Sequence, residues 1–280
     1  MRGEVIGLLS VVAMGIEILE SLRDYFSNQM DMKFFFNSDI LYLPDLFRNL
    51  SEGSFSFSHW HFSAATFIFP DWVFYGIAYF FSHDAYYAFP IFFCLQIIVF
   101  WFLTWALNDF LIRNRWSSLF GASFFSVIVL FFAHKNVYPF TLILVSVSHF
   151  GELLSWMAST LLLLTLVSRQ KNSLGLRGAM AALVALFSFL TTGSDKLFIV
   201  NWAIPSIMTL VILFFLKMID RQDLLFLGGF IALGTVPGSL LYHLYPHVFR
   251  LFNKIDGDHL EGPGDPQVYD RARFEGARAT

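Results

Sequence analysis

The sequence predicts an all-α protein: a polytopic bundle of transmembrane helices with interfacial juxtamembrane helices in its first outer loop. Of its 280 residues, 56% are hydrophobic and only 14% are charged. Soluble domains average roughly 45–50% apolar and about 25% charged residues. Several apolar runs also reach the roughly 17–25 residues that cross the hydrocarbon core of a bilayer. These observations exclude an ordinary soluble domain and predict a multi-pass membrane protein.

Seven apolar segments are predicted to span the membrane. The first lies close to Met1, and we expect an uncleaved span there. A signal peptide is the alternative, but no clear small-x-small cleavage site follows the apolar stretch. The seven segments are 5–20, 86–107, 117–133, 149–168, 178–192, 197–216 and 223–242.

Positive charge sets the predicted orientation of these spans. Short connections rich in Lys and Arg stay cytoplasmic. Two spans separate each basic connection from the next, so all three belong on one side. This parity puts the N-terminus inside, residues 21–85 in one long outer loop, and the C-terminal end outside. The stretch 134–148 fits either an outer re-entrant segment or an extension of a neighbouring helix. The basic connections are Arg113/Arg115, Arg169/Lys171/Arg177 and Lys217/Arg221.

An eighth apolar stretch, "FIFPDWVFYGIAYFF" at 67–81, breaks this parity if it crosses the membrane. It is short, and Asp71 follows Pro70 within it. Apolar stretches of about 10–15 residues are more often interfacial or re-entrant than spanning. We therefore expect a helix along the outer surface whose first turn is set by Pro70, with Asp71 facing water or a cavity.

The rest of the first outer loop combines acidic, imidazole and aromatic side chains. The stretch "FFFNSDILYLPDLFRNL" at 34–50 alternates apolar and polar residues at near-helical spacing and is interrupted by Pro44. It predicts an amphipathic helix, or a broken pair, on the outer membrane surface. Asp39 could cap this helix or act chemically. His59 and His61, on either side of Trp60, could be interface residues or contact a ligand.

Ionisable residues within membrane spans are functional candidates. His149 and Glu152 are three residues apart, so they share a helix face near the outer end of their span. Lys196 lies in the tight turn "GSDK" and could bind an anionic group or reach the interface as a snorkelling lysine. Glu17 and Glu20 lie at the outer end of the first span. Together with His149 and Glu152 they could wall one outward cavity, or all four could simply reach water at the span ends.

The order of these features resembles the GT-C class of membrane glycosyltransferases, which take sugars from polyprenyl-phosphate carriers. Asp39 in "NSDILYLPDL" matches the catalytic aspartate in the first loop of that class, and Asp71 in "FPDWVFY" matches a second acidic position more loosely. The segment "TGSDKLFIVNWAIPSIM" at 192–208 is similar to an outer-turn-then-span element of such bacterial proteins. The resemblance covers residues 1–245, although the chain is shorter than the class and has fewer spans.

The resemblance implies an enzyme that moves a sugar from a polyprenyl-phosphate donor to an envelope acceptor on the outer face of the bacterial inner membrane. Its catalytic residues would be Asp39 and Asp71, as bases or as ligands of a divalent cation on the phosphate. We expect the lipid bilayer as a partner and no nucleic acid. The side chains expected to contact substrate are Lys196, His149, Glu152, His59 and His61.

Two other functions stay open: a non-catalytic partner or scaffold in an envelope complex, and a transporter or flippase. A transporter would carry broken helices at mid-bilayer or a repeated half, and the sequence shows neither clearly. In an enzyme, the acidic residues of the first loop should meet one of His149, Glu152 or Lys196 at an outward cavity. In a scaffold they should scatter. Residues 246–280 are polar and rich in Gly and Asp, which predicts a disordered tail.

Overall fold

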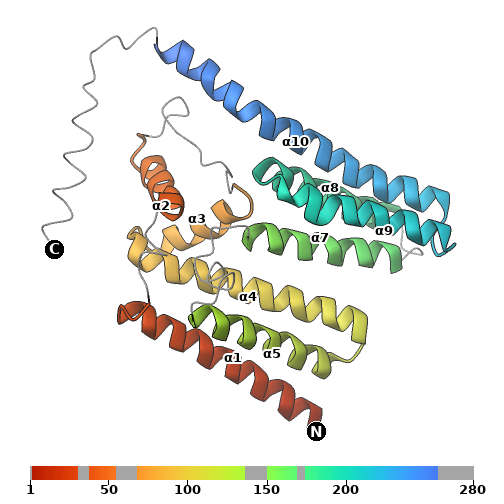
Figure 1. The fold of residues 1–280 in the computed structure, drawn as a ribbon, viewed down its shortest axis with the longest axis horizontal. Coiled ribbons are helices and arrows are strands. Elements are labelled where there is room, and N and C mark those ends of the chain that lie inside the picture. Colours follow the sequence, from red (N-terminus) through yellow and green to blue (C-terminus); the bar gives the residue numbers. More distant parts are fainter. Residues whose placement is uncertain (1, 31–37, 55–67, 136–149, 169–173, 258–280) are drawn as a thin grey trace, which may run out of the picture. The chain divides into compact units, whose positions relative to one another are not determined.

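A computed structural model describes residues 2–30, 38–54, 68–135, 150–168 and 174–257 of the chain. Every regular element in this part of the chain is helical, which confirms the all-α prediction (Figure 1). In chain order the helices are α1 (Arg2–Phe26), α2 (Ser38–Ser51), α3 (Asp71–Phe81), α4 (Ala85–Ile112), α5 (Arg115–His134), α7 (Phe150–Ser168), α8 (Leu174–Ser194), η1 (Ile199–Ala203), α9 (Ile204–Phe215) and α10 (Arg221–Gly257).

In the part of the chain that the structure describes, six helices are long and apolar enough to cross a membrane, and they match six of the seven predicted spans. This architecture is that of a multi-pass membrane protein. The seventh predicted span, 197–216, is a shorter apolar helix, Ile199–Phe215, formed by the π-helix η1 and by α9. At roughly 1.5 Å per residue it rises about 26 Å, a little less than the bilayer core. The six are Gly3–Phe26, Ala85–Ile112, Arg115–His134, Phe150–Ser168, Gly175–Ser194 and Arg221–Leu244.

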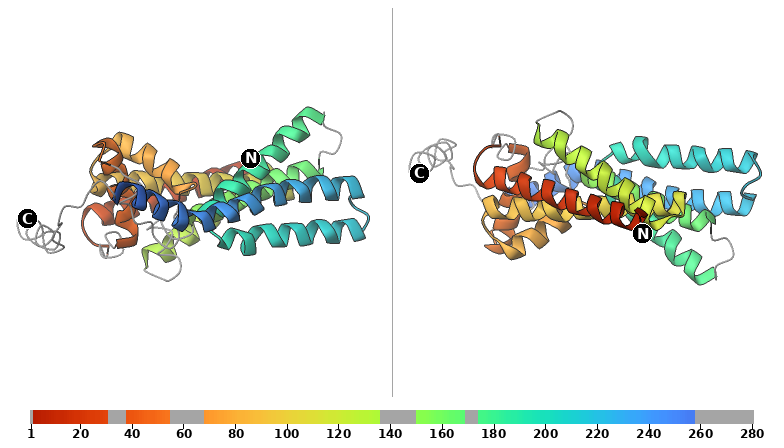
Figure 2. Two further views of the ribbon diagram at one scale, coloured as in Figure 1. Left: turned by 90° about the horizontal axis from the view of Figure 1, so that it is seen from above. Right: turned by 90° about the horizontal axis from the view of Figure 1, so that it is seen from below.

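Helix contacts give the order α1–α5–α4–α7–α8 across the bundle (Figures 1 and 2). The two consecutive helices α4 and α5 form an antiparallel hairpin, and Arg113 at its turn has a left-handed backbone conformation. Helix α1 packs against α5 rather than against the next helix in sequence. The two short helices form a layer of their own on one end of α4, because α3 packs on α4 and α2 packs on α3.

Polar contacts identify which helix ends lie together. The Tyr25 hydroxyl at the end of α1 donates to the backbone oxygen of Tyr86 at the start of α4 (2.9 Å). Next to it, the Asp24 carboxylate lies 3.2 Å from His134 Nε2 at the end of α5. At the opposite end of α1, Gly7 packs against the start of α5. Helices α1 and α5 are therefore parallel, and one end of the bundle carries α3.

Polar contacts also identify the helix ends in the second half of the bundle. The backbone N–H of Phe69, just before α3, donates to Ser194 Oγ at the end of α8 (3.0 Å). At the other end of α8, Arg177 forms an ion pair with Asp223 at the start of α10. Arg113 and Arg177 thus lie at the end opposite α3. This agrees with the prediction that the basic connections share one side, and the side itself remains a prediction.

Helices α8 and α10 approach closely because α10 carries glycine at two positions four residues apart. A Cβ at Gly234 would lie 2.2 Å from the backbone oxygen of Ala185, and a Cβ at Gly238 would lie 2.6 Å from that of Phe189. Small residues at this spacing let transmembrane helices pack backbone to backbone. The pair therefore fixes the contact between α8 and α10.

The two short helices correspond to the predicted interfacial segments. Helix α3 has 11 residues and rises about 17 Å, which is too short to cross a bilayer core. Helix α2 continues through Pro44, so the stretch forms one helix instead of a broken pair. Leu43 and Leu46 are buried, whereas Asp45 and Arg48 are exposed, which gives α2 its predicted amphipathic character.

Two predicted boundaries shift. The first span was predicted at 5–20, and α1 continues through the start of the predicted outer loop to Phe26. Helix α10 continues to Gly257, so the first part of the segment 246–280, which was predicted to be disordered, is helical. The predicted disorder of the remaining tail falls outside the described residues.

Candidate functional site

Asp71 is the first residue of α3 and is held inside the protein. Its side chain is only 2% exposed. Gln96 of α4 donates a hydrogen bond from Nε2 to Asp71 Oδ1 at 2.7 Å. Gly151 of α7 lies against the carboxylate, since a Cβ there would be 2.6 Å from both of its oxygens. The prediction that Asp71 faces water or a cavity is therefore wrong: it joins α3 to two spanning helices.

A second buried carboxylate, Asp195, lies where α8 ends. It is 6% exposed, and one of its oxygens accepts a hydrogen bond from the backbone N–H of Leu197 at 2.9 Å. The Oγ of the preceding residue, Ser194, accepts the hydrogen bond from the Phe69 N–H described above. Asp195 was not among the predicted site residues. Its position in the "TGSD" turn before a helix, where Asp commonly satisfies free backbone N–H groups, was the available signal.

Glu152, a predicted site residue in the first turn of α7, is buried and forms a hydrogen bond with a side chain of another helix. Its side chain is 6% exposed, and Asn201 of η1 donates from Nδ2 to Glu152 Oε1 at 3.1 Å. The neighbouring Trp202 is fully buried and donates from Nε1 to Thr160 Oγ1 of α7 at 3.0 Å. Two side-chain hydrogen bonds therefore fasten η1 to α7.

The π-helix explains how Asn201 and Trp202 both reach α7. A π-helical turn inserts one extra residue and changes the direction in which side chains leave the helix; such turns are frequent at functional sites. No local pattern in the sequence predicts η1, because the mainly apolar run continues through it without Gly. For this reason Asn201 was not predicted as a site residue.

Beside the Glu152–Asn201 pair lies an open groove of about 440 Å³. Its polar groups are the Glu152 carboxylate and the Asn201 amide, and Trp156, which is 40% exposed, supplies an aromatic wall. Two leucines, Leu153 and Leu197, are the other described residues that line it. The groove therefore combines a buried negative group with an accessible indole.

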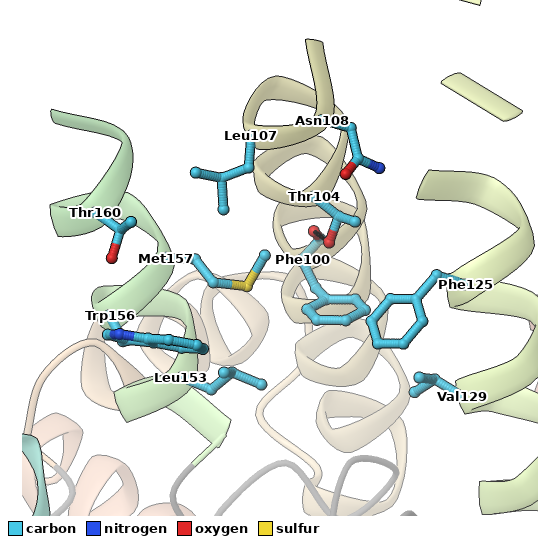
Figure 3. A pocket seen from close by; sticks show the side chains of 10 residues that line it. All are labelled: Phe100, Thr104, Leu107, Asn108, Phe125, Val129, Leu153, Trp156, Met157 and Thr160. Atoms are coloured by element: carbon cyan, nitrogen blue, oxygen red, sulfur yellow. Dashed lines mark hydrogen bonds between the residues drawn. The ribbon is translucent and has the colours of Figure 1, made fainter. Parts of the chain in front are cut away.

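A second hollow, of about 400 Å³, opens among α4, α5 and α7 (Figure 3). Its lining is almost wholly apolar, and the Thr104 hydroxyl is already bonded to the backbone oxygen of Phe100 (2.8 Å). Leu153 and Trp156 line both hollows, so the polar groove and the apolar pocket adjoin along one face of α7. The pocket is lined by Phe100, Thr104, Leu107, Asn108, Phe125, Val129, Leu153, Trp156, Met157 and Thr160.

The structure brings some predicted site residues together and leaves others apart. Asp71 and Glu152 come close because Gly151, which contacts Asp71, precedes Glu152 in the chain. Lys196 is exposed, and its ammonium lies 4.2 Å from the centre of the Tyr242 ring in a cation–π contact. Asp39 is the second residue of α2.

His59, His61 and His149 lie outside the described residues. Within the described ranges, no group of three His, Cys, Asp or Glu side chains is arranged to hold a metal ion. The divalent cation that the resemblance implies therefore stays a prediction.

Tyr75, one turn after Asp71 on α3, shows how tightly the short helices pack. It is fully buried against the rings of Phe47, Phe89 and Phe92. Burial, with a smaller contribution from nearby Tyr79, raises the pKa of the Tyr75 phenol well above its ordinary value. Tyr75 therefore stays neutral and serves packing.

Comparison with protein-family models, with curated proteins and with solved structures found no match to this chain.

Proposed function

We propose that the protein is an integral membrane glycosyltransferase that moves a sugar from a polyprenyl-phosphate donor to an envelope acceptor. The reaction would take place on the outer face of the bacterial inner membrane, at the end of the bundle that carries α3. In this proposal Asp39 acts on the acceptor hydroxyl as a base, or holds a divalent cation on the donor phosphate. The motif around Asp39 supports this role through its resemblance to the GT-C class.

The observation that carries the proposal is the adjoining pair of hollows along α7. A lipid-linked sugar has a polar head and a long hydrocarbon chain, so its site needs a polar region that continues into an apolar one. The groove with Glu152 and Asn201 supplies the first, and the pocket among α4, α5 and α7 supplies the second. Leu153 and Trp156 line both hollows, so the polar and the apolar region adjoin.

A second candidate function, a non-catalytic partner in an envelope complex, is favoured by the burial of Asp71. A catalytic carboxylate must reach its substrate, whereas Asp71 is 2% exposed and is held by Gln96. This contact gives Asp71 a positioning role: it fixes the start of α3 and hence the layer of α3 and α2. In our proposal, catalysis therefore rests on Asp39, and Asp71 supports the layer that carries it.

The test is a transfer assay on the purified full chain in liposomes. The probes are polyprenyl-phosphate-linked hexoses labelled in the sugar, incubated with bacterial membrane fractions that supply envelope acceptors. The proposal expects label to leave the lipid fraction and appear in acceptor only when the protein is present. If no hexose of the panel shows protein-dependent transfer, while the protein is folded by its thermal unfolding transition, the enzyme assignment fails and the non-catalytic function is favoured.

A further inference from the structure

The groove beside α7 carries the negative charge of Glu152, and none of its described lining residues has a positive side chain. Those residues are one glutamate, one asparagine, one tryptophan and two leucines. Lys196 is adjacent in sequence to Leu197, but its ammonium lies over the ring of Tyr242. The lining therefore favours some ligand chemistries and opposes others.

The polar groups of the groove are fixed in place before any ligand binds. The Glu152 carboxylate is 6% exposed and accepts a hydrogen bond from Asn201 at 3.1 Å. Asn201 is one residue from Trp202, which is fully buried and bonded to Thr160. Because both partners are anchored, little conformational entropy is lost when a ligand binds.

We infer that this groove binds the uncharged sugar ring of a lipid-linked glycoside, with Glu152 and Asn201 on its hydroxyl groups and Trp156 against its C–H face. A carboxylate accepts several hydrogen bonds, and an amide both donates and accepts them, which suits a ring with many hydroxyls. A half-exposed indole offers a flat apolar surface. The inference rests on the proposed function for the nature of the ligand and assigns the sugar to particular side chains.

The same groove is unsuited to the phosphate of the carrier lipid. Two negative groups a few ångströms apart repel each other, strongly so where water is scarce. The phosphate must therefore lie outside the groove, and the sugar is the part of the head that enters it. An ammonium group would also suit a carboxylate beside an indole, so a cationic ligand is the rival that the experiment has to separate.

Three photoreactive probes with the same alkyl chain separate these ligands: an alkyl glucoside, an alkyl phosphate and an alkyl trimethylammonium. Each carries a diazirine beside its head group and is titrated against the full chain in lipid nanodiscs. The inference expects saturable labelling of α7 or η1 by the glucoside, displaced by unlabelled glucoside and by neither other probe. Equal or better displacement by the phosphate or the ammonium compound overturns it, as does labelling by the glucoside that never saturates.

Substitutions tie the binding to the named side chains. Glu152→Gln keeps the size of the side chain but removes its charge, and it should weaken glucoside binding about tenfold, which corresponds to about 1.4 kcal/mol. Trp156→Ala should weaken it similarly, whereas Trp156→Phe, which keeps an aromatic face, should stay within about threefold of wild type. Glu52→Gln is the matched control, because Glu52 is exposed and does not line the groove. Wild-type affinity in Glu152→Gln overturns the inference.

This experiment separates failure of the inference from failure of the proposed function, because binding is measured without transfer. If the protein transfers sugar but Glu152→Gln binds glucoside as well as the wild type does, the proposed function stands and the sugar site does not lie in the groove. If glucoside binding is saturable and depends on Glu152 but no transfer occurs, the sugar site is supported and the proposed glycosyltransferase activity fails. Each protein is compared at equal folded fraction, judged by its thermal unfolding transition.

Discussion

The carboxylate of Asp71 occupies the space that a side chain at position 151 would fill. Both of its oxygens lie 2.6 Å from the place of a Cβ on Gly151. The contact joins the short helix α3 to the spanning helix α7. Gly151, which Asp71 contacts, is the residue that precedes Glu152 in the chain. A glycine in the first turns of a helix thus determines how the surface layer is attached to the bundle.

Gly151→Ala should destabilise the protein, because the new methyl group cannot be placed without moving the carboxylate or α3. Overpacking of this kind costs about 1–3 kcal/mol. The control is Gly178→Ala on α8, where a Cβ meets nothing within 4 Å and where Ala should stabilise the helix slightly. Cys94, the one cysteine of the chain, is half-buried in α4, so a thiol-reactive dye can follow thermal unfolding in detergent.

A double substitution tests whether the loss of stability in Gly151→Ala comes from the contact with Asp71. In an Asp71→Ala background the clash is absent, so Gly151→Ala should cost much less than it does in the wild type. Such non-additivity is the mark of two residues in direct contact. Equal costs in the two backgrounds would show that the Gly151 effect does not arise from Asp71.

Gly234→Ala should weaken the packing of α10 on α8. A Cβ at this position would lie 2.2 Å from the backbone oxygen of Ala185, an atom that cannot move without displacing its helix. Gly228→Ala is the matched control on the same helix, since a Cβ there meets no atom within 4 Å. We expect a clear fall in unfolding temperature for Gly234→Ala and none for Gly228→Ala. Similar behaviour of both variants would contradict the close approach.

Tyr75→Phe should leave stability unchanged or raise it by up to about 1 kcal/mol, although Tyr75 is fully buried. Its hydroxyl has no hydrogen-bond partner among the described residues, and a buried hydroxyl without a partner is unfavourable. The raised pKa of Tyr75 also has a consequence at alkaline pH. The unfolded chain loses this proton near pH 10, before the folded protein does, so unfolding is favoured as the pH rises above about 10. Tyr75→Phe should reduce this alkaline loss of stability, and a marked destabilisation at neutral pH would contradict the assignment.

Membrane orientation can be tested by labelling single cysteines in a Cys94→Ser background. Ser54 follows α2, and Asn114 lies at the turn between α4 and α5; both are exposed. The basic connections predict that an impermeant thiol reagent added outside labels Ser54→Cys and misses Asn114→Cys. Permeabilised cells should label both, which controls for reactivity. The reverse pattern in intact cells would invert the topology.

Helix positions could largely be predicted from sequence, because a membrane-spanning helix requires a long apolar run. Such a run is a local property of the sequence and does not depend on tertiary contacts. The same holds for α3, where a short run after Pro70 predicted a helix too short to span. The surroundings of Asp71 could not be predicted. They depend on Gln96 and Gly151, which are distant in sequence, and on the absence of a side chain at Gly151.

The candidate site was predictable only in part, for related reasons. Glu152 stood out because a charge within an apolar run is unusual. Its partner Asn201 did not, because its orientation depends on a π-helical turn inside a continuous apolar segment. The adjoining hollows along α7 arise from the packing of three helices, which no local pattern of residues specifies.

The most direct test of the account compares Asp39→Asn with Asp45→Asn in the transfer assay. Both residues lie on α2, and Asp45 is an exposed residue whose ion pair with Arg48 (3.5 Å) contributes little. Asn caps a helix about as well as Asp, so a capping role predicts near-normal rates for Asp39→Asn. Catalysis by Asp39 predicts a loss of several orders of magnitude in that variant, with Asp45→Asn close to wild type. Near-normal transfer by Asp39→Asn would contradict the central claim.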